Sequence, residues 1–270
     1  MSDNQQDTHK LVCLEVWGGN QRVSHSVELP GLASWVYSAP LQPACPAPKL
    51  RDGASGGGDV LYLSVCERDM LSRVAVADVS GHGQAVSTLA EKLRSLMEKY
   101  INIWDQSDLM RELNQAFQRG LTDVKYATLL VLGFYRQTGQ VVFTNAGHLP
   151  PLWYHTAEKQ WGWLEDRMAE TEAEVPGLPL GLIGGTNYYQ AAVKLAVGDL
   201  LVLYTDAVPE AKDPAGSQLG EQGLLKLASS LPVDSPEAFG EGLLAAVRAY
   251  RNGAPASDDE TLLVLQRIVA

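Results

Sequence analysis

The chain has 270 residues, 46% of them hydrophobic and 20% charged, which is typical of a globular protein that folds in water. With 21 basic and 32 acidic residues its net charge is −11, and no basic cluster stands out, which argues against nucleic acid as a partner because phosphate binding depends on Lys and Arg. The longest apolar run, Ala127 to Phe134, is far shorter than the roughly 20 residues of a membrane-spanning helix, so we expect no membrane association.

The first ten residues are polar and lack the basic and apolar regions of a signal peptide, so we expect a flexible tail at 1–10 and a cytoplasmic location. Nine later segments read as strands: 11–17, 33–38, 60–66, 73–79, 126–135, 141–145, 188–195, 199–205 and 261–268. In several of them apolar residues follow one another without alternation, and such strands must be covered on both faces. The turn signal at 136–140 predicts a hairpin and therefore antiparallel pairing.

Three segments place apolar residues at every third or fourth position and are predicted helices: 84–100, 107–121 and 235–250. Ser107 is the expected N-cap of the second helix. Helices of this kind need an apolar surface to pack on, and the strands need cover on both faces. We therefore predict an α+β fold, a four-layer α-β-β-α sandwich of two antiparallel sheets flanked by helices, with residues 1–270 forming a single domain.

Four aspartates lie at the ends of the most apolar predicted strands: Asp59, Asp78, Asp206 and Asp258. A hairpin turn centred near residues 68–69 would place Asp59 opposite Asp78, where two carboxylates repel each other. Asp206 and Asp258 would share a sheet edge if their strands are antiparallel neighbours. One such aspartate alone is usually a turn or cap residue.

Four carboxylates together need a proton or a cation to relieve their repulsion, and these motifs contain no Lys or Arg. Ligands that are all oxygen select hard ions, which favours Mg²⁺ or Mn²⁺. Two such ions would permit hydrolysis of a phosphate ester, because they lower the pKa of a bridging water and hold the phosphoryl oxygens.

Seven segments, spread in order over about residues 55 to 268, match motifs of a known family. They are GGD at 57–59, ADVSGHG at 77–83, YATL at 126–129, NAGHLPP at 145–151, GLPLG at 177–181, GD through YTD at 198–206, and SDDETL at 257–262. In these motifs the chain resembles the metal-dependent protein phosphatases (type 2C, or PPM), specifically their bacterial SpoIIE-like branch. The resemblance implies the α-β-β-α fold and a serine/threonine phosphatase that removes phosphate from proteins without a phosphoenzyme intermediate.

The resemblance also implies a role for each acidic position. Asp78 matches the ligand that bridges two metal ions, Mn²⁺ or Mg²⁺. Asp206 and Asp258 match the remaining protein ligands of one ion. Asp59 and the backbone carbonyl of Val79 match ligands of the other ion.

Five further residues lie within the matched motifs. Asp259 matches a position that supports the ligands rather than binding metal. His82 is a candidate general acid for the leaving serine oxygen, although relatives often carry Lys there, which points to loop geometry instead. Ser80 and Gly81 precede the first helix, so their N–H groups could face a phosphate, or Ser80 could simply cap that helix. His148 is expected to be structural.

Two departures from the family pattern leave other functions open. Ala207 stands where relatives usually have Gly, and a positive φ there would cost Ala about 1 kcal/mol. Val60-Leu61-Tyr62 replaces a Phe-Tyr-Asp common among relatives, so a supporting acid is missing. The alternatives are a catalytically decayed phosphatase fold that docks a signalling partner, and a small-molecule phosphatase or other hydrolase that uses the same metal ions.

The resemblance further suggests the partners of the protein. The substrate would be a phosphorylated protein in bacterial signalling, such as an anti-sigma antagonist. A second copy of the chain or a regulator would dock on the helices within residues 84–121.

Overall fold

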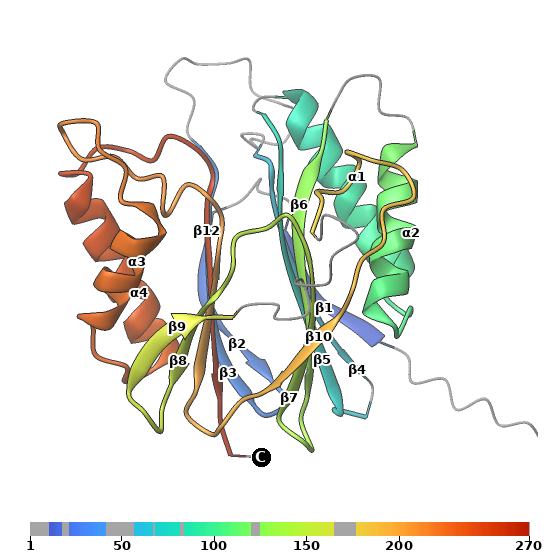
Figure 1. Ribbon diagram of the computed structural model, residues 1–270, viewed down its shortest axis with the longest axis horizontal. Coiled ribbons are helices and arrows are strands. Elements are labelled where there is room, and N and C mark those ends of the chain that lie inside the picture. The colour runs from blue at the N-terminus through green and yellow to red at the C-terminus, as the bar shows by residue number, and fades with distance from the viewer. Residues whose placement is uncertain are drawn as a thin grey trace, which may run out of the picture.

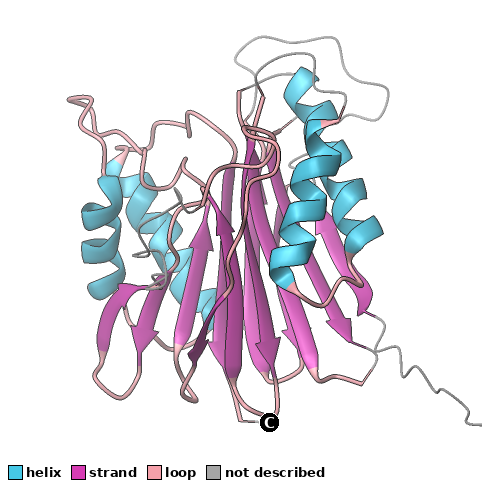
Figure 2. Ribbon diagram, turned by 45° about the vertical axis from the view of Figure 1, so that its right-hand side comes forward, coloured by secondary structure: helices cyan, strands magenta, loops and turns pink. Residues whose placement is uncertain are grey.

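The computed structural model describes residues 11–17, 22–41, 57–66, 68–81, 84–119, 125–164 and 177–269. Two antiparallel sheets face each other in the middle of the molecule, and a pair of helices covers the outer face of each (Figure 1). The view turned by 45° shows the strands in the middle of the molecule with helices on either side of them (Figure 2). The predicted four-layer α-β-β-α sandwich is therefore confirmed. The predicted tail at 1–10 and the candidate acid His82 lie outside the described residues.

The first sheet, called sheet A, carries the strands that lead into the predicted metal centre. Its order is β1 (Leu11–Trp17), β4 (Asp59–Cys66), β5 (Leu71–Val79), β6 (Ala127–Tyr135), β7 (Gln140–Ala146) and β10 (Ala191–Lys194). Its outer face is covered by α1 (Gln84–Tyr100) and α2 (Gln106–Gln118).

The second sheet, called sheet B, packs against the inner face of sheet A. Its order is β2 (Val23–Leu29), β3 (Leu32–Ala39), β12 (Glu260–Arg267), β11 (Leu200–Tyr204), β8 (Leu152–His155) and β9 (Gln160–Trp163). Its outer face is covered by α3 (Gly220–Ser229) and α4 (Pro236–Tyr250).

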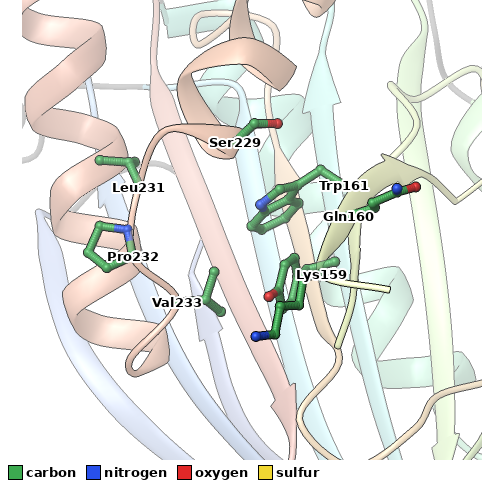
Figure 3. Close-up of a pocket in the computed structure, with 8 residues that line it drawn as sticks. Lys159, Gln160, Trp161, Ser229, Leu231, Pro232 and Val233 are labelled. Carbon is green, nitrogen blue, oxygen red and sulfur yellow. The ribbon is translucent and has the colours of Figure 1, made fainter. Parts of the chain in front are cut away.

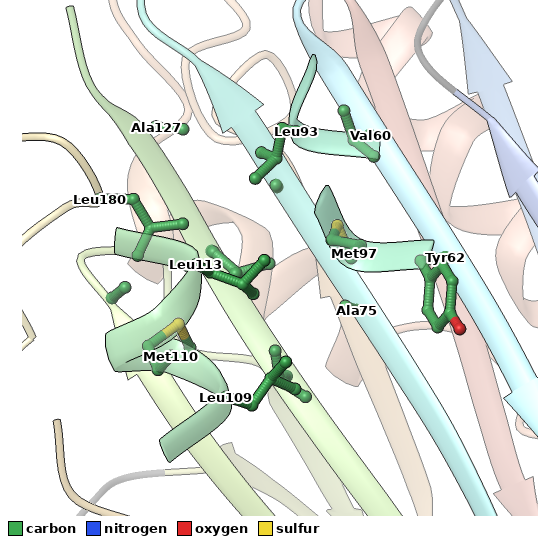
Figure 4. Close-up of a cluster of buried hydrophobic side chains, with 14 of the residues drawn as sticks. Val60, Tyr62, Ala75, Leu93, Met97, Leu109, Met110, Leu113, Ala127 and Leu180 are labelled. Carbon is green, nitrogen blue, oxygen red and sulfur yellow. The ribbon is translucent and has the colours of Figure 1, made fainter. Parts of the chain in front are cut away.

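Every residue of β4 is buried, because this strand has a core on each side. Side chains alternate between the two faces of a strand, so Val60 and Tyr62 pack under α1 and α2, whereas Leu61 and Leu63 pack between the sheets. Figure 4 shows the first of these cores, in which Leu93 and Met97 of α1 lie over the strands. The unbroken apolar runs of the sequence thus follow from burial on both faces.

The structure contains elements that the sequence patterns did not reveal. Strand β2 exposes three consecutive residues and so lacks a clear pattern, β8 and β9 have four residues each, and α3 begins without a side-chain N-cap. The predicted cap of α2 was wrong: Asp105, not Ser107, is the N-cap, and its carboxylate accepts a hydrogen bond from the Asp108 N–H at 2.9 Å. No helix among the described residues has both the length and the apolar content needed to cross a membrane.

Candidate metal centre

Asp59 and Asp78 face each other across the hairpin formed by β4 and β5. Their Cα atoms are register partners, as the position of the turn predicted. The turn itself is tight, with Asp69 at φ +54° and its N–H bonded to the Cys66 carbonyl at 2.8 Å. The hairpin therefore brings the first two predicted ligands to the same end of sheet A.

Asp59 is buried between the two sheets and is only 2% exposed. Its Oδ2 accepts a hydrogen bond from Thr205 Oγ1 at 3.0 Å, and that hydroxyl in turn accepts one from the Thr261 N–H at 3.0 Å. Burial raises the pKa of Asp59 well above its ordinary value, and the charge of Asp78 raises it further, while bonds from Thr261 and Thr205 lower it. Asp59 is thus a buried acid anchored to sheet B.

Asp78 lies where acidic groups from both sheets converge. Burial, as the largest cause, raises the pKa of its carboxyl to about 7. The remaining causes are the charges of Asp206, Asp258, Asp259 and Glu210, in that order. The ends of β5, β11 and β12 therefore bring acids that are distant in sequence within electrostatic reach of one another, as expected from the predicted strand ends.

Asp206 follows β11 and faces the same cluster. Burial first, then Glu210 and Asp258, raises the pKa of Asp206 to about 6, while the Ala207 N–H lowers it. Sequence reasoning missed Glu210, whose N–H bonds to the Asp206 carbonyl at 2.9 Å within one turn. The spacing of four residues was the available signal, since one helical turn returns a side chain to the same side.

Asp259 uses both carboxylate oxygens to hold neighbouring backbone. Its Oδ1 accepts from the Leu41 N–H at 2.6 Å and its Oδ2 from the Gly58 N–H at 2.5 Å. Burial raises the pKa of Asp259, and these two bonds lower it. Asp259 thereby holds Gly58, the residue before Asp59.

Gly58 is where backbone and side-chain oxygens come together. A Cβ atom placed on Gly58 would lie 2.8 Å from the Val79 carbonyl oxygen and 3.3 Å from Asp78 Oδ1. Side chains rarely tolerate the first of these distances, so only glycine fits. The Val79 carbonyl oxygen and Asp78 Oδ1 consequently border one small space.

The loop after Asp78 is tied to the start of β6. The Ser80 N–H donates to the Tyr126 carbonyl at 2.9 Å, and Ser80 Oγ accepts from the Tyr126 N–H at 3.1 Å. The Ser80 N–H is therefore used within the fold and does not face a phosphate. Gly81 is exposed and has φ +105°, a conformation that suits glycine.

The donor set of this centre fits a hard divalent cation. Its acids supply only oxygen atoms and raise one another's pKa, and a bound cation would relieve that repulsion. Among the described residues, no three His, Cys, Asp or Glu side chains come as close together as the ligands of one ion. The carboxylates therefore share an electrostatic environment without forming a closed cage.

Two further expectations were tested at the edge of this centre. Ala207 does not have a positive φ, since the described non-glycine residues with one are Asp69, Lys159 and Asn252, so it carries no strain of that kind. His148 is structural, as expected. It is 7% exposed, its Nδ1 lies 2.8 Å from Thr128 Oγ1, and burial lowers its pKa to about 4.

A separate hollow of about 630 Å³ lies between the β8–β9 hairpin and the connection from α3 to α4 (Figure 3). Tyr154 and Trp161 form one wall, and Leu231 and Val233 form the other. The Trp161 ring stacks on Phe239 with 4.9 Å between centroids. None of the predicted site residues lines this hollow.

Comparison with known proteins places this architecture in a family. The family description "Stage II sporulation protein E (SpoIIE)" matches residues 69–268. "Phosphoserine phosphatase RsbU" of Bacillus subtilis is 25% identical over 212 residues, which are 77% of this chain and 59% of RsbU. The chain thus spans less than two thirds of that relative.

Solved structures share the fold. The SiaA-PP2C domain of Pseudomonas aeruginosa has a TM-score of 0.67 at 19% identity, covering 86% of this chain and 85% of that one. The catalytic domain of the serine/threonine protein phosphatase PstP, in complex with two manganese ions, has a TM-score of 0.58 at 12% identity, covering 88% and 98%. The chain therefore belongs to the SpoIIE family, the SpoIIE-like branch of the type 2C metal-dependent protein phosphatases.

Proposed function

We propose that this chain is a metal-dependent serine/threonine protein phosphatase that hydrolyses phosphoserine or phosphothreonine in a protein of bacterial signalling. The observation that carries the proposal is the convergence of Asp78 with acids from the ends of both sheets; burial first, and then the charges of these acids, raise the pKa of Asp78 to about 7. The name of the relative RsbU, a phosphoserine phosphatase, supports the same activity. We treat the whole fold as one phosphatase domain.

The proposed centre holds two Mn²⁺ or Mg²⁺ ions. Asp78 would bind both, Asp206 and Asp258 would complete the first site, and Asp59 and the Val79 carbonyl would serve the second. Bound ions of this kind would activate a water molecule and hold the phosphoryl oxygens. The two manganese ions in PstP support this assignment.

The residues of the chain position these ligands. Thr205 holds one oxygen of Asp59, which sets the carboxylate between the sheets. Asp259 fixes the Gly58 N–H and so the entry into β4. His82 is proposed to give a proton to the leaving serine oxygen, and Gly81 to offer its N–H to the phosphate.

The proposed substrate is a phosphorylated protein, with an anti-sigma antagonist as the candidate suggested by the family. The exposed faces of α1 and α2 are the proposed docking surface for a second copy or a regulator. Their position suits regulation, because α1 comes next along the chain after β5, which carries Asp78 near its end, and the loop that carries Gly81.

The activity can be tested with purified protein and an aryl phosphate. We expect Mn²⁺ to stimulate hydrolysis and EDTA to abolish it. Asp78→Asn should lower the rate at least about 100-fold, because Asp78 is proposed to touch both ions. The exposed Asp234 provides the matched control, Asp234→Asn, which should retain the wild-type rate.

The same assay separates the alternatives. If the wild-type protein folds but shows no turnover with added Mn²⁺, the decayed binding module replaces the phosphatase. If the protein cleaves phosphoserine peptides no faster than free phosphorylated metabolites, the small-molecule phosphatase is favoured.

A further inference from the structure

A lysine lies directly over the loop that joins β5 to α1. A Cβ atom placed on Gly81 would be 2.9 Å from Lys125 Nζ, so the ammonium group is in contact range of this exposed glycine. Lys125 itself is partly buried just before β6. Its position is fixed by the adjacent residue, because Tyr126 makes two hydrogen bonds with Ser80, at 2.9 and 3.1 Å.

Among the described residues no carboxylate is found in an ion pair with Lys125; the pairs of Arg111 with Asp108 and of Arg251 with Glu260 do not involve it. The neighbouring cluster is acidic, with Asp78 only three residues before Gly81. A cation at this edge is therefore available to a negatively charged group that arrives from solvent.

We propose that Lys125 binds a phosphoryl oxygen of the substrate and is a specificity-determining residue for phosphate monoesters. This inference rests on the proposed phosphatase function. The phosphate monoester carries close to two negative charges at neutral pH, and an acidic rim repels it. An ammonium group over Gly81 offsets that repulsion with a charge-assisted hydrogen bond, in the place where the loop leads into α1.

The position of Lys125 also accounts for the glycine beneath it. Any side chain at residue 81 would meet the ammonium group, and the φ of +105° disfavours one as well. Gly81 thus leaves room for Lys125 to lie close to the backbone. Tyr126, the next residue along the chain, is 38% exposed.

The test compares Lys125→Gln and Lys125→Arg with wild type and with the control Lys226→Gln, which changes an exposed lysine on α3. In saturating Mn²⁺ we expect Lys125→Gln to weaken binding of inorganic phosphate by about tenfold or more, measured by calorimetry, with a similar fall in kcat/KM for a phosphoserine peptide. Lys125→Arg should retain most of the phosphate affinity and most of the kcat/KM of wild type. The Mn²⁺ concentration for half-activation should stay within about twofold of wild type, as should all values for Lys226→Gln.

Phosphate affinity equal to wild type in Lys125→Gln would overturn the proposal. A changed Mn²⁺ requirement with unchanged phosphate affinity would overturn it as well, because Lys125 would then act on the carboxylates. A wild-type protein that binds phosphate through Lys125 but hydrolyses nothing would refute the phosphatase function and leave this binding role standing. Hydrolysis by wild type that Lys125→Gln leaves unchanged would refute the binding role of Lys125 and leave the phosphatase function standing.

Discussion

Thr205 Oγ1 donates a hydrogen bond to Asp59 Oδ2 at 3.0 Å, and this bond connects sheet B to sheet A beside the candidate metal centre. Thr205 is fully buried and Asp59 nearly so. The hydroxyl bridges further, since it accepts from the Thr261 N–H. Thr205, which follows β11, therefore bonds to Asp59 on β4 and to Thr261 on β12.

Replacing this hydroxyl should weaken both stability and metal binding. Thr205→Val keeps the shape but removes the hydroxyl that donates to Asp59 Oδ2 and accepts from the buried Thr261 N–H, which should lower the free energy of unfolding by about 1–3 kcal/mol. Thr205→Ser keeps the hydroxyl and should lose less. Urea denaturation with and without Mn²⁺ measures both effects, and equal midpoints for the two variants would contradict the role of the hydroxyl.

The raised pKa values predict how the ion-free protein responds to pH. Folding raises the pKa of Asp78 to about 7 and that of Asp206 to about 6, from an ordinary 3.8. Between about pH 3.8 and pH 7 the folded state therefore binds more protons than the unfolded state. The stability these groups contribute is therefore fully present below pH 3.8 and is lost as the pH rises through about 6 and 7.

Denaturation in EDTA from about pH 5 to about pH 8 tests this dependence. Asp78→Asn should flatten the fall in stability, whereas the control Asp234→Asn should not. Adding Mn²⁺ should oppose the fall at the upper end, because ion binding favours the ionised carboxylates. Stability that rises with pH in EDTA for wild type relative to Asp78→Asn would contradict the raised pKa.

Gly58→Ala tests the small space bordered by the Val79 and Asp78 oxygens. The added methyl group would approach the Val79 carbonyl to 2.8 Å and must displace it. We expect at least about a tenfold loss of Mn²⁺-dependent rate and a higher Mn²⁺ requirement. Gly162→Ala is the control, since a Cβ there would meet nothing within 4 Å. Matching activity in the two variants would show that these oxygens are not used together.

Two glycines of α4 give opposite predictions for stability. A Cβ on Gly240 would lie 2.3 Å from Trp35 Cε3, so Gly240→Ala should overpack this core and lower the free energy of unfolding by about 1–3 kcal/mol. A Cβ on Gly242 would lie 3.6 Å from Leu231 Cδ2, an ordinary van der Waals distance. Gly242→Ala should therefore raise the free energy of unfolding by up to about 1 kcal/mol. Thermal unfolding followed by tryptophan fluorescence distinguishes them.

The parts of the fold that local patterns specify were predictable. Strands β4 and β5 are apolar on both faces, and their turn determines that Asp59 faces Asp78, so this half of the centre followed from counting residues along a hairpin. The pairing of β11 with β12 likewise brings Asp206 and Asp258 to one edge. The helices α1 and α4 followed from their apolar periodicity.

The remaining features depend on tertiary contacts that carry no local signal. The hairpin of β8 and β9 is short and half-buried, and it forms against β11 and α3 rather than through its own pattern. The bond from Thr205 to Asp59 joins residues 146 positions apart. Lys125 stands alone in sequence and becomes notable only when β6 places it over Gly81.

The acids of the candidate centre come from both halves of the sandwich: Asp78 ends a strand of one sheet, and Asp206 follows a strand of the other. An ion bound by both aspartates would crosslink the two sheets. The sheets could then separate only when the ion is released. Metal occupancy would consequently set how often the interior opens to solvent or to a protease, even when no substrate is present.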